Sequence, residues 1–422
     1  MKIAIVGSGI SGLSTAYLLS PHAQVTVYEK EDRIGGHANT ALIKNNGQEI
    51  RVDTGFMVFN PERYPYFIKL ISRLGVASVE TDMSFSVSIP KVVEYSSFIS
   101  GLFGDLAQLA KPRYWVFLFH ILKFNNSAKK FLKQPEKSTI SLGEFIEKNN
   151  FSQELVQWYL YPMLGCIWSS GFGEVENFPA QETLRFLDNH RLLNTFNRPK
   201  WRTIQGGSTS YVYKLVEQLK KEGVVFHTRK PVNSVRRVGD AVEVESESHQ
   251  QQYDYVVMAS HADETLDILK NPTKQEEQVL GKFSYTRNVT VLHSDTSYMP
   301  KRKQAWASWN YFTQGNNTTR ESISLTYWMN NLQGLSTQLP VLITLNPKRT
   351  IDKKYIHETY NYSHPHFNQQ AREAQDQLHT IQGTQRILFA GAHWGYGFHE
   401  DGVVSAIDVL RALDLENRLD YE

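Results

Sequence analysis

The sequence has a single cysteine, Cys166, so it cannot form an intramolecular disulfide. One thiol also excludes a metal site built from several cysteines, and such low cysteine content is typical of proteins in a reducing compartment. Basic and acidic residues nearly balance at a net charge of +2, which gives no electrostatic reason to expect nucleic acid as a partner. We expect no metal site, because no His or carboxylate pair has metal-ligand spacing, and we expect a loop at His364–His366.

The sequence also lacks an apolar run long enough to span a bilayer. The longest, Tyr114–Leu122, falls short of the 18 or so residues that a membrane-spanning helix needs. The short apolar run near Met1 is interrupted by Gly7 and Gly9, and no signal-peptide cleavage site follows it. We therefore expect a cytoplasmic protein.

Residues 2–19, KIAIVGSGISGLSTAYLL, have the pattern of a strand, a glycine turn and a helix. The continuous apolar run before the turn is typical of a strand covered on both faces. Gly7 permits the tight turn, Gly9 lets the backbone approach a pyrophosphate, and Gly12 lets the helix pack closely on the strand. A pyrophosphate would then meet free N–H groups at the helix N-terminus. The other expected contacts in this loop are Ser8, Ile10 and Ser11.

A second strand is predicted at Gln24–Lys30, and it reaches an acidic residue, Glu29, at its end. A carboxylate at this position can accept hydrogen bonds from the ribose hydroxyls of an adenosine. Strand, glycine turn, helix, strand and acid come in the order that a dinucleotide-binding unit requires. The beginning of the chain is therefore predicted to bind a dinucleotide.

The segment after Glu29, KEDRIGGHANT, resembles the flavin amine oxidase superfamily, which includes protoporphyrinogen oxidases and phytoene desaturases. These proteins carry an acid, a short spacer and then R-x-G-G, matched here by Glu29, Arg33, Gly35 and Gly36. In the family the second glycine pair passes beside the FAD phosphates, where Arg33 would supply a cation. The resemblance implies FAD rather than NAD, held noncovalently because Cys166 lies in no attachment motif. Two flanking residues join this predicted site, Lys30 and His37.

Later segments carry the same resemblance. Residues 52–60 match a D-x-G segment that passes near the flavin ring, 201–219 a glycine turn and helix, 253–261 an apolar strand, and 386–413 the closing FAD signature. The FAD-binding residues that the resemblance implies here are Asp53, Thr54, Gly55, Phe56, Val232, Ala259, Ser260, Gly391, Ala392, Asp401, Gly402 and Val403. Many members have Glu where this chain has Ala392, so the contact to the ribityl chain is left to His393 or to a backbone group.

Four segments are closer still to a bacterial subfamily of predicted NAD/FAD-binding proteins. They are VDTGFMVFN, WASWNY, TYWMN and GYGFHEDG. Genes of this subfamily often neighbour those of cyclopropane-fatty-acyl-synthase-like proteins. The resemblance thus associates the chain with lipid metabolism without giving a mechanism.

The expected fold is α/β, with a doubly wound, Rossmann-like FAD-binding domain and a discontinuous substrate domain of mixed sheet and helices. We predict that the FAD-binding domain comprises residues 1–81, 201–285 and 383–422, and that the substrate domain comprises 82–200 and 286–382. Within the substrate domain, a half-buried strand is expected where apolar residues alternate at Phe85, Val87 and Ile89.

The substrate is expected to lie across the flavin in a largely apolar cavity. The predicted walls are aromatic and suit either an apolar chain or a cation. These wall residues are Trp168, Trp309, Tyr327 and Trp328. Because the flavin takes the hydride, a dedicated acid or base is not required. The catalytic candidates are Tyr396, His399 and Glu400. His399 and Glu400 either move protons near neutral pH or only bond backbone around the Asp401 turn.

These observations predict an FAD-dependent oxidoreductase that oxidises or desaturates a hydrophobic substrate, such as a fatty acyl chain or an isoprenoid. Amine oxidation is the nearest alternative. Two others are a redox-neutral double-bond isomerase and a non-catalytic flavoprotein partner of a lipid-modifying enzyme. Aromatic and basic residues are interleaved at 111–134, which indicates either peripheral membrane contact or a core helix with a basic solvated side.

Overall fold

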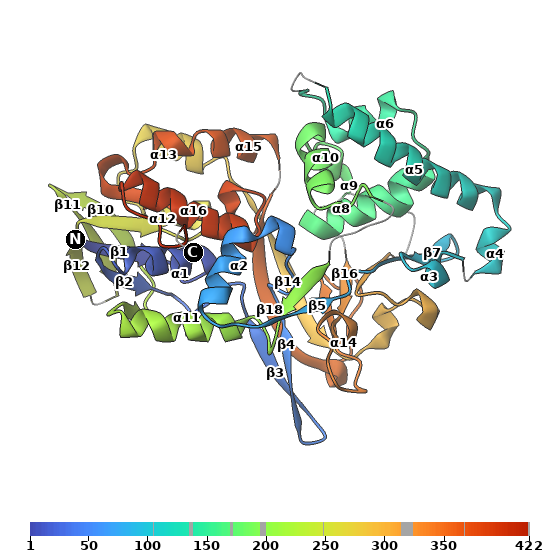
Figure 1. Cartoon of the computed structure of the whole chain (residues 1–422), viewed down its shortest axis with the longest axis horizontal. Helices are drawn as coiled ribbons and strands as arrows, with labels where there is room; N and C mark the ends of the chain where they lie inside the picture. The colour runs from blue at the N-terminus through green and yellow to red at the C-terminus, as the bar shows by residue number, and fades with distance from the viewer. Residues whose placement is uncertain are drawn as a thin grey trace.

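Two regions lie side by side in the computed structural model of the chain, one around a parallel sheet and one around a larger mixed sheet with a helical layer (Figure 1). The structure describes residues 1–103, 105–134, 138–168, 172–194, 200–247, 249–313, 324–366 and 368–420. Within them, no helix combines the length and the apolar character needed to cross a membrane.

The first region is organised by a five-stranded parallel sheet with the order β19-β13-β1-β2-β9. Its strands are β1 (Lys2–Val6), β2 (Gln24–Tyr28), β9 (Val225–His227), β13 (Tyr255–Met258) and β19 (Ile387–Phe389). Strand β1 lies in the middle, which is why its run is apolar without alternation. Ile3 and Ile5 pack into the core on one face, and Ala4 and Val6 into the core on the other.

Helices cover one face of this sheet, namely α1 (Ile10–Leu19), α2 (Pro65–Arg73), α11 (Thr209–Lys221) and α16 (His399–Ala412). The other face carries an antiparallel sheet and three helices: β10 (Ser234–Val238), β11 (Ala241–Ser246), β12 (His249–Tyr253), α12 (Ala262–Ile268), α13 (Lys274–Leu280) and α15 (Gln369–Asp376). The predicted α/β class is confirmed. Helix α15 falls within the range predicted for the substrate domain, yet its Ala371 and Ala374 pack in this core.

The second region contains a seven-stranded mixed sheet with the order β18-β14-β17-β16-β15-β6-β7. Its strands are β6 (Phe85–Ile89), β7 (Val93–Ser96), β14 (Tyr285–His293), β15 (Trp309–Phe312), β16 (Leu325–Trp328), β17 (Leu342–Leu345) and β18 (Ile356–Pro365). The parallel pair β15–β6 joins segments far apart in sequence. The predicted strand is confirmed at β6, but it is not half-buried, because Ser86 and Ser88 are buried as well as Val87 and Ile89.

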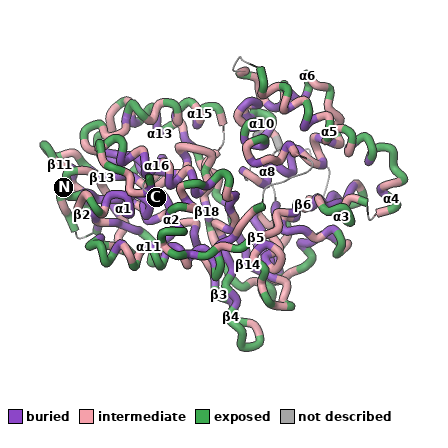
Figure 2. The backbone as a smooth tube through the Cα atoms, in the orientation of Figure 1, coloured by how far each residue is buried: buried purple, intermediate pink, exposed green. Residues whose placement is uncertain are grey.

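A helical layer packs against β6, β7, β15 and β16 (Figure 1). Its members are α3 (Ile99–Phe103), α4 (Leu106–Leu109), α5 (Pro112–Leu132), α6 (Leu142–Lys148), α7 (Gln153–Leu155), α8 (Tyr161–Trp168), α9 (Phe172–Val175) and α10 (Ala180–Asn189). The remaining strands and a short helix are β3 (Thr40–Asn45), β4 (Gln48–Asp53), β5 (Ser78–Thr81), β8 (Trp201–Ile204) and α14 (Met329–Leu332). Figure 2 shows the buried backbone concentrated in the sheets and in α1, with an exposed tip on the β3–β4 hairpin.

Candidate functional site

A cavity of about 960 Å³ is lined by residues from both regions. This volume is at the upper end of the range of roughly 300–1,000 Å³ that is usual for ligand pockets. Residues at the carboxyl ends of β1, β2, β13 and β19 form one end of it, which we call the nucleotide end. The carboxyl edge of a parallel sheet is the usual ligand-binding edge of such folds. Residues of α8 and of β14 to β18 contribute to the other end, which we call the substrate end.

The glycine turn between β1 and α1 forms the floor of the nucleotide end. Gly7 has a φ of +105°, and a Cβ at Gly12 would lie 2.0 Å from the Gly7 carbonyl oxygen, so both positions require glycine. A Cβ at Gly9 would meet nothing within 4 Å. Helix α1 begins after Gly9 with no side-chain cap and no acid in its first turn. Its N–H groups and positive dipole end are therefore free to meet an anionic group such as a pyrophosphate.

The second glycine pair lies directly against the first. Gly36 has a φ of +57°, and a Cβ there would lie 3.0 Å from the Gly9 Cα. The Gly35 N–H donates to the Ser8 carbonyl over 3.0 Å. Arg33 Nη1 donates to the Gly36 carbonyl over 2.7 Å, which places its guanidinium at the same end of the cavity. The structure thus brings together the two glycine segments that were identified separately in the sequence.

Glu29 follows β2 and lines the cavity beside the glycine turn. Its Oε2 accepts hydrogen bonds from the Ser8 N–H over 3.1 Å and from Ser8 Oγ over 2.5 Å. The neighbouring Lys30 forms an ion pair with Glu264 at 2.6 Å. The carboxylate therefore occupies the place expected for an acid that accepts from ribose hydroxyls.

His37 supplies a further polar group at the cavity wall. Its Nε2 is buried and has no hydrogen-bond partner among the described residues. Burial, together with His364 and His261 nearby, lowers the pKa of His37 well below its usual value, so the ring is neutral. A buried nitrogen without a partner is unfavourable, and a ligand's polar atom would satisfy it. The open glycine floor, the free helix end and this nitrogen together fit a dinucleotide.

Most of the predicted FAD-binding residues line the cavity. These are Gly7, Ser8, Gly9, Ile10, Ser11, Glu29, Lys30, Arg33, Gly36, His37, Thr54, Gly55, Phe56, Val232, Ala259, Ser260, Gly391 and Ala392. The others lie behind the wall: Gly12, Gly35, Asp53, Asp401, Gly402 and Val403. Gly402 shows why, since a Cβ there would lie 2.7 Å from Ile10 Cγ2. This glycine lets α16 pack closely on α1 and does not face a ligand.

Asp53 needs a correction, because its carboxylate is fully buried and faces away from the cavity. It accepts hydrogen bonds from Thr40 Oγ1 at 2.6 Å, from Ser208 N at 2.7 Å and from Gln333 Nε2 at 2.8 Å. Burial raises the pKa of Asp53 to about 6 although these bonds oppose the rise. The residue joins the end of β4 to the beginning of α11 and so positions the Thr54–Phe56 segment that does line the cavity.

The prediction of a catalytic role for Glu400 is also corrected. Its carboxylate lies outside the cavity lining and accepts hydrogen bonds from Tyr66 N at 3.0 Å and from Phe67 N at 2.9 Å, at the beginning of α2. Asp401 has a similar role, since its Oδ2 accepts hydrogen bonds from Tyr396 N at 3.1 Å and from Phe398 N at 2.9 Å. Glu400 therefore bonds backbone at α2 and not around the Asp401 turn, and neither acid lines the cavity.

Two of the predicted catalytic residues, Tyr396 and His399, do line the cavity. The His399 ring stacks on Phe56 with 3.5 Å between ring centroids, and its Nε2 lies 3.0 Å from the Tyr211 hydroxyl. Burial lowers the pKa of His399 to about 3. The ring therefore stays neutral near pH 7, and proton transfer from a protonated His399 at that pH is not supported. Burial raises the pKa of Tyr396, which is likewise uncharged.

The substrate end contains three of the four predicted aromatic walls, Trp168, Trp309 and Tyr327. Trp328 does not line the cavity and packs edge-on against Trp306, with 5.3 Å between ring centroids. Met57 and Val58, from the segment expected near the flavin ring, also line the cavity, as do Cys166 and Ile167. Lining residues that were not predicted include Thr290, Leu332 and Leu345. Burial raises the pKa of the Cys166 thiol well above its usual value, so it is not a thiolate.

Strand β18 was missed by the sequence analysis and runs along the cavity. Tyr360, Tyr362 and His364 line it, so the expected loop is wrong for His364, which belongs to this strand. The Tyr362 hydroxyl contacts Thr54 Oγ1 at 2.7 Å and accepts from Asn39 Nδ2 at 3.2 Å. The alternation of these ring side chains with short polar residues is the sequence signal that would have predicted this strand.

The parallel sheet, the two glycine segments and the acid after β2 define a flavin-dependent oxidoreductase. The family model for flavin containing amine oxidoreductases matches residues 10–308, and the chain belongs to this family. Over 165 residues it is 28% identical to the protoporphyrinogen oxidase of Dictyostelium discoideum. This match covers 35% of the chain and spans less than a third, 29%, of that relative.

Solved structures show the same fold over nearly the whole chain. The CLA-producing fatty acid isomerase from P. acnes superposes with a TM-score of 0.68 at 15% identity, covering 97% of this chain and 98% of that one. Cyclohexylamine oxidase from Brevibacterium oxydans IH-35A gives a TM-score of 0.69 at 14% identity, covering 98% and 99%. At such low identity the likeness concerns the fold alone.

Proposed function

We propose that the protein binds FAD noncovalently in this cavity and oxidises or desaturates a neutral hydrophobic substrate, such as a fatty acyl chain or an isoprenoid. One observation supports a neutral hydrophobic substrate. None of the described cavity-lining residues from α8 or from β14 to β18 is a Lys, Arg, Asp or Glu. The charged lining residues belong to the nucleotide end, where Glu29, Arg33 and Glu264 are examples.

The electrostatics of the substrate end favour a neutral ligand over an amine. An ammonium group that enters this end would lose its water and meet no carboxylate there, which is unfavourable. His364 does not supply a charge, because burial lowers its pKa to about 4. Since the fatty acid isomerase and the cyclohexylamine oxidase share this fold, the lining rather than the fold supports the lipid substrate.

The FAD assignment is supported by the fit of the nucleotide end. Gly9 and Gly36 leave the backbone open to a pyrophosphate, Glu29 suits a ribose, and His37 Nε2 is available to a ligand. A noncovalent cofactor is supported because the single thiol, Cys166, is protonated and lines the substrate end.

A bound flavin would supply hydride transfer. The protein's own contribution is then placement rather than charge. Trp168, Trp309 and Tyr327 would orient an apolar chain and exclude water from the reacting carbon. His399 and Tyr396 are neutral, so near pH 7 they act as hydrogen-bonding walls.

The first test is a visible absorption spectrum of the purified protein, followed by acid precipitation. A flavin spectrum that appears in the supernatant supports noncovalent flavin, and chromatography then separates FAD from FMN. Colour that stays with the pellet means covalent attachment. A colourless protein that cannot be reconstituted with FAD would overturn the assignment.

The second test is anaerobic flavin bleaching with two sets of compounds, one of unsaturated fatty acids and isoprenoids and one of short amines. Bleaching by the lipids, with a product two hydrogens lighter, is the expected outcome. A product of unchanged mass would identify a double-bond isomerase. Bleaching by amines alone would overturn the lipid substrate. Neither bleaching nor any product with either set would favour the non-catalytic alternative.

A further inference from the structure

Helices α3, α4 and α5 lie at the end of the molecule far from the parallel sheet (Figures 1 and 2). On and beside them, large apolar side chains are exposed. Ile99 is 80% exposed, Leu106 81% and Phe119 63%. We call this surface the α3–α5 face, and its apolar members are Phe98, Ile99, Phe103, Leu106, Trp115, Val116, Phe119 and Leu122. Exposed apolar side chains gathered in this way mark an interaction surface.

Contacts between the helices make the face continuous. The ring centroids of Phe103 on α3 and Trp115 on α5 lie 6.4 Å apart. Trp115 Nε1 donates to the Leu109 carbonyl at the end of α4 over 2.8 Å, so its polar atom is satisfied while its ring stays half exposed. The Tyr114 hydroxyl donates to the Leu102 carbonyl over 2.8 Å. These bonds tie α3 and α4 to the long helix α5.

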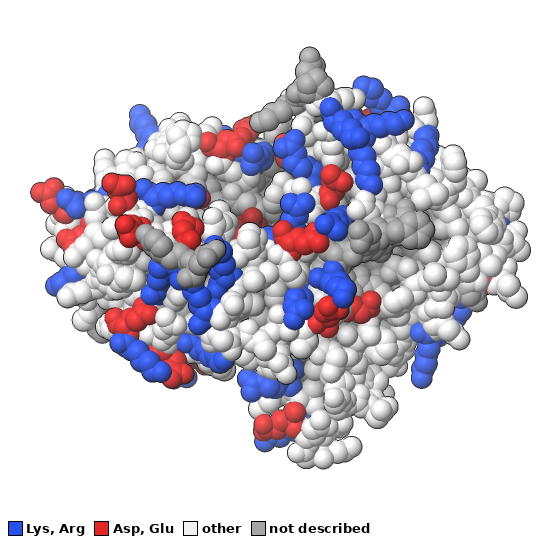
Figure 3. All heavy atoms as spheres, viewed as in Figure 1, with Lys and Arg blue, Asp and Glu red and all other residues white. Residues whose placement is uncertain are grey.

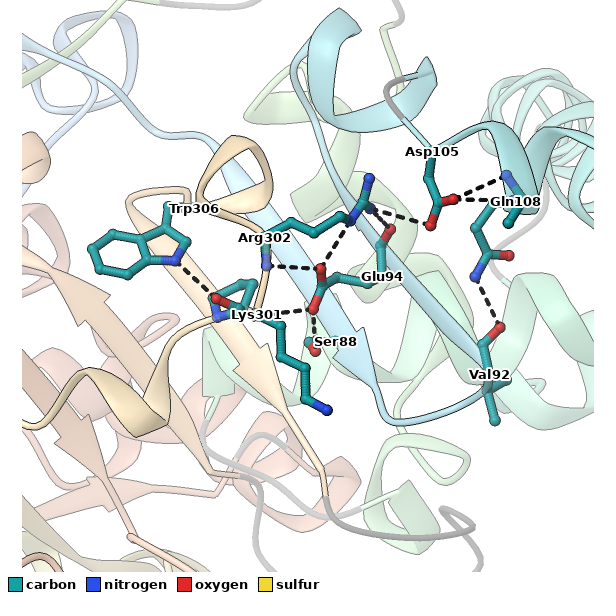
Figure 4. A network of polar contacts seen from close by, with 10 residues as sticks. Ser88, Val92, Glu94, Asp105, Gln108, Lys301, Arg302 and Trp306 are labelled. Carbon is teal, nitrogen blue, oxygen red and sulfur yellow. Dashed lines mark hydrogen bonds and ion pairs between the residues drawn. The ribbon is translucent and has the colours of Figure 1, made fainter.

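A network of ion pairs and hydrogen bonds fixes the face to the mixed sheet (Figure 4). Asp105 caps α4 by accepting from Ala107 N at 3.0 Å, and it also pairs with Arg302 at 3.7 Å. The guanidinium of Arg302 bonds Glu94 of β7 at 3.0 Å. The two short helices are therefore held in place against the sheet, and the carboxylate of Asp105 points inward to this network.

The segment that carries the face has charge mostly of one sign, and Arg113 within it pairs with Glu154 at 2.9 Å. Residues 98–134 contain six Lys or Arg and a single acid, Asp105, which the network occupies. Lys111, Lys130 and Lys133 have no ion pair with any described acid. Figure 3 shows few charged atoms over the end of the molecule that carries α3 and α4. An apolar surface bordered by unpaired lysines is complementary to an anionic lipid surface.

We propose that the α3–α5 face docks on the surface of an anionic lipid bilayer. Phe98, Ile99, Leu106 and Phe119 would enter the boundary between headgroups and acyl chains, and the lysines would contact the anionic headgroups. The excess of unpaired lysines beside the apolar residues favours this occupant over a protein partner or a second copy of the chain. The inference goes beyond the proposed function and does not depend on which substrate the cavity binds.

The test is flotation of the purified full-length protein with two kinds of vesicle, phosphatidylcholine alone and phosphatidylcholine with about 30 mol% phosphatidylglycerol. We expect binding to the anionic vesicles and at least about tenfold weaker partitioning to the neutral ones. Raising the salt from about 0.05 M to about 0.5 M should release the protein, because the lysine contribution is screened.

Two single variants test the apolar part of the face. We expect Leu106→Asp and Phe119→Asp each to lower partitioning about tenfold or more, because a carboxylate replaces an inserted apolar group beside anionic lipid. Tyr213→Asp is the matched control, since Tyr213 is 64% exposed on α11 and its change should leave partitioning unaltered. Replacing Lys130 or Lys133 by Gln should weaken binding about fivefold each. Melting temperatures of the variants confirm that they fold.

Three results would overturn the proposal. One is a wild-type protein that stays unbound with both kinds of vesicle. Another is equal partitioning of the Leu106→Asp variant and the wild type. The third is a dimer in light scattering that Leu106→Asp dissociates while vesicles bind neither form, which would assign the face to a second copy of the chain.

Discussion

The two ends of the cavity are built in different ways. At the nucleotide end the wall is largely backbone: Gly9 and Gly36 touch, and the free end of α1 faces the same space. At the substrate end the wall is made of side chains from separate strands and from α8, such as Trp309, Tyr327 and Cys166. A wall of backbone needs particular glycines, whereas a wall of side chains can change residue by residue without altering the fold. Such a division allows one fold to carry different activities.

The largest effect is expected from a substitution at Gly12, in the backbone wall of the nucleotide end. We expect Gly12→Ala to destabilise the protein by more than about 3 kcal/mol, because its Cβ would overlap the Gly7 carbonyl and push α1 off the sheet. Gly9→Ala is the control in the same turn: its Cβ meets no protein atom, so the apoprotein should melt as the wild type does while FAD binds more weakly. Thermal melts and FAD titrations of both variants measure this, and equal melting temperatures would contradict it.

The scaffold behind the nucleotide end should respond to pH through Asp53. Its pKa is raised to about 6 in the folded protein, against about 3.9 in an unfolded chain. The folded state then holds the proton more tightly, so this contribution to stability is complete below about pH 4 and is lost as pH rises through 6. A shift of this size corresponds to about 3 kcal/mol. Denaturant unfolding of the wild type and Asp53→Asn from pH 4 to pH 7 measures it, and parallel pH profiles would refute the assignment.

At the substrate end, Trp309→Ala sharpens the contrast between the two ends. Removing this ring should lower kcat/KM for an apolar substrate about tenfold, which corresponds to about 1.4 kcal/mol of lost transition-state binding. FAD affinity should stay within about twofold of wild type, because no part of Trp309 belongs to the nucleotide end. Steady-state kinetics and FAD titration on the same preparation separate the two effects. If Trp309→Ala lost FAD but showed unchanged kinetics once loaded with it, the separation of the cavity into a nucleotide end and a substrate end would be contradicted.

The smallest effect is expected at Glu400. Glu400→Gln should destabilise the protein by about 1 kcal/mol, because the carboxylate caps the first turn of α2. Turnover by the FAD-loaded protein should be unchanged at pH 7, since the side chain does not line the cavity. A fall of tenfold or more in kcat with unaltered stability would restore Glu400 as a catalytic candidate.

The nucleotide end was largely predictable from the sequence because its parts are local. Gly7, Gly9, Gly12 and Glu29 have fixed spacing within one strand-turn-helix-strand unit, and a pattern of this length can be read directly. The errors at the nucleotide end concern the direction in which a side chain points. Asp53 lies in a matching segment, but the backbone around it turns the carboxylate toward Ser208 and away from the cavity.

The substrate end was predictable in composition but not in arrangement. Thr290, Leu332 and Leu345 meet because β14 and β17 pair antiparallel and α14 joins the same wall, and no local pattern specifies such pairing. The exposure of the α3–α5 face could not be predicted from the sequence either. Aromatic residues spaced along a helix have the same sequence pattern whether or not another layer covers them. Tyr114 and Trp115 are neighbours, yet one is buried and the other half exposed.

The position of β19 in the parallel sheet has a consequence for synthesis. Strand β13 pairs with β1, and β19 then completes the edge, although Ile387 follows β1 by more than 380 residues. The cavity walls at Gly391 and His399 come later still. A ribosome therefore has to translate through both regions before the nucleotide end has all of its parts. A nascent chain that stops short of Ile387 would expose the edge of β13, and we expect it to depend on chaperones until β19 arrives.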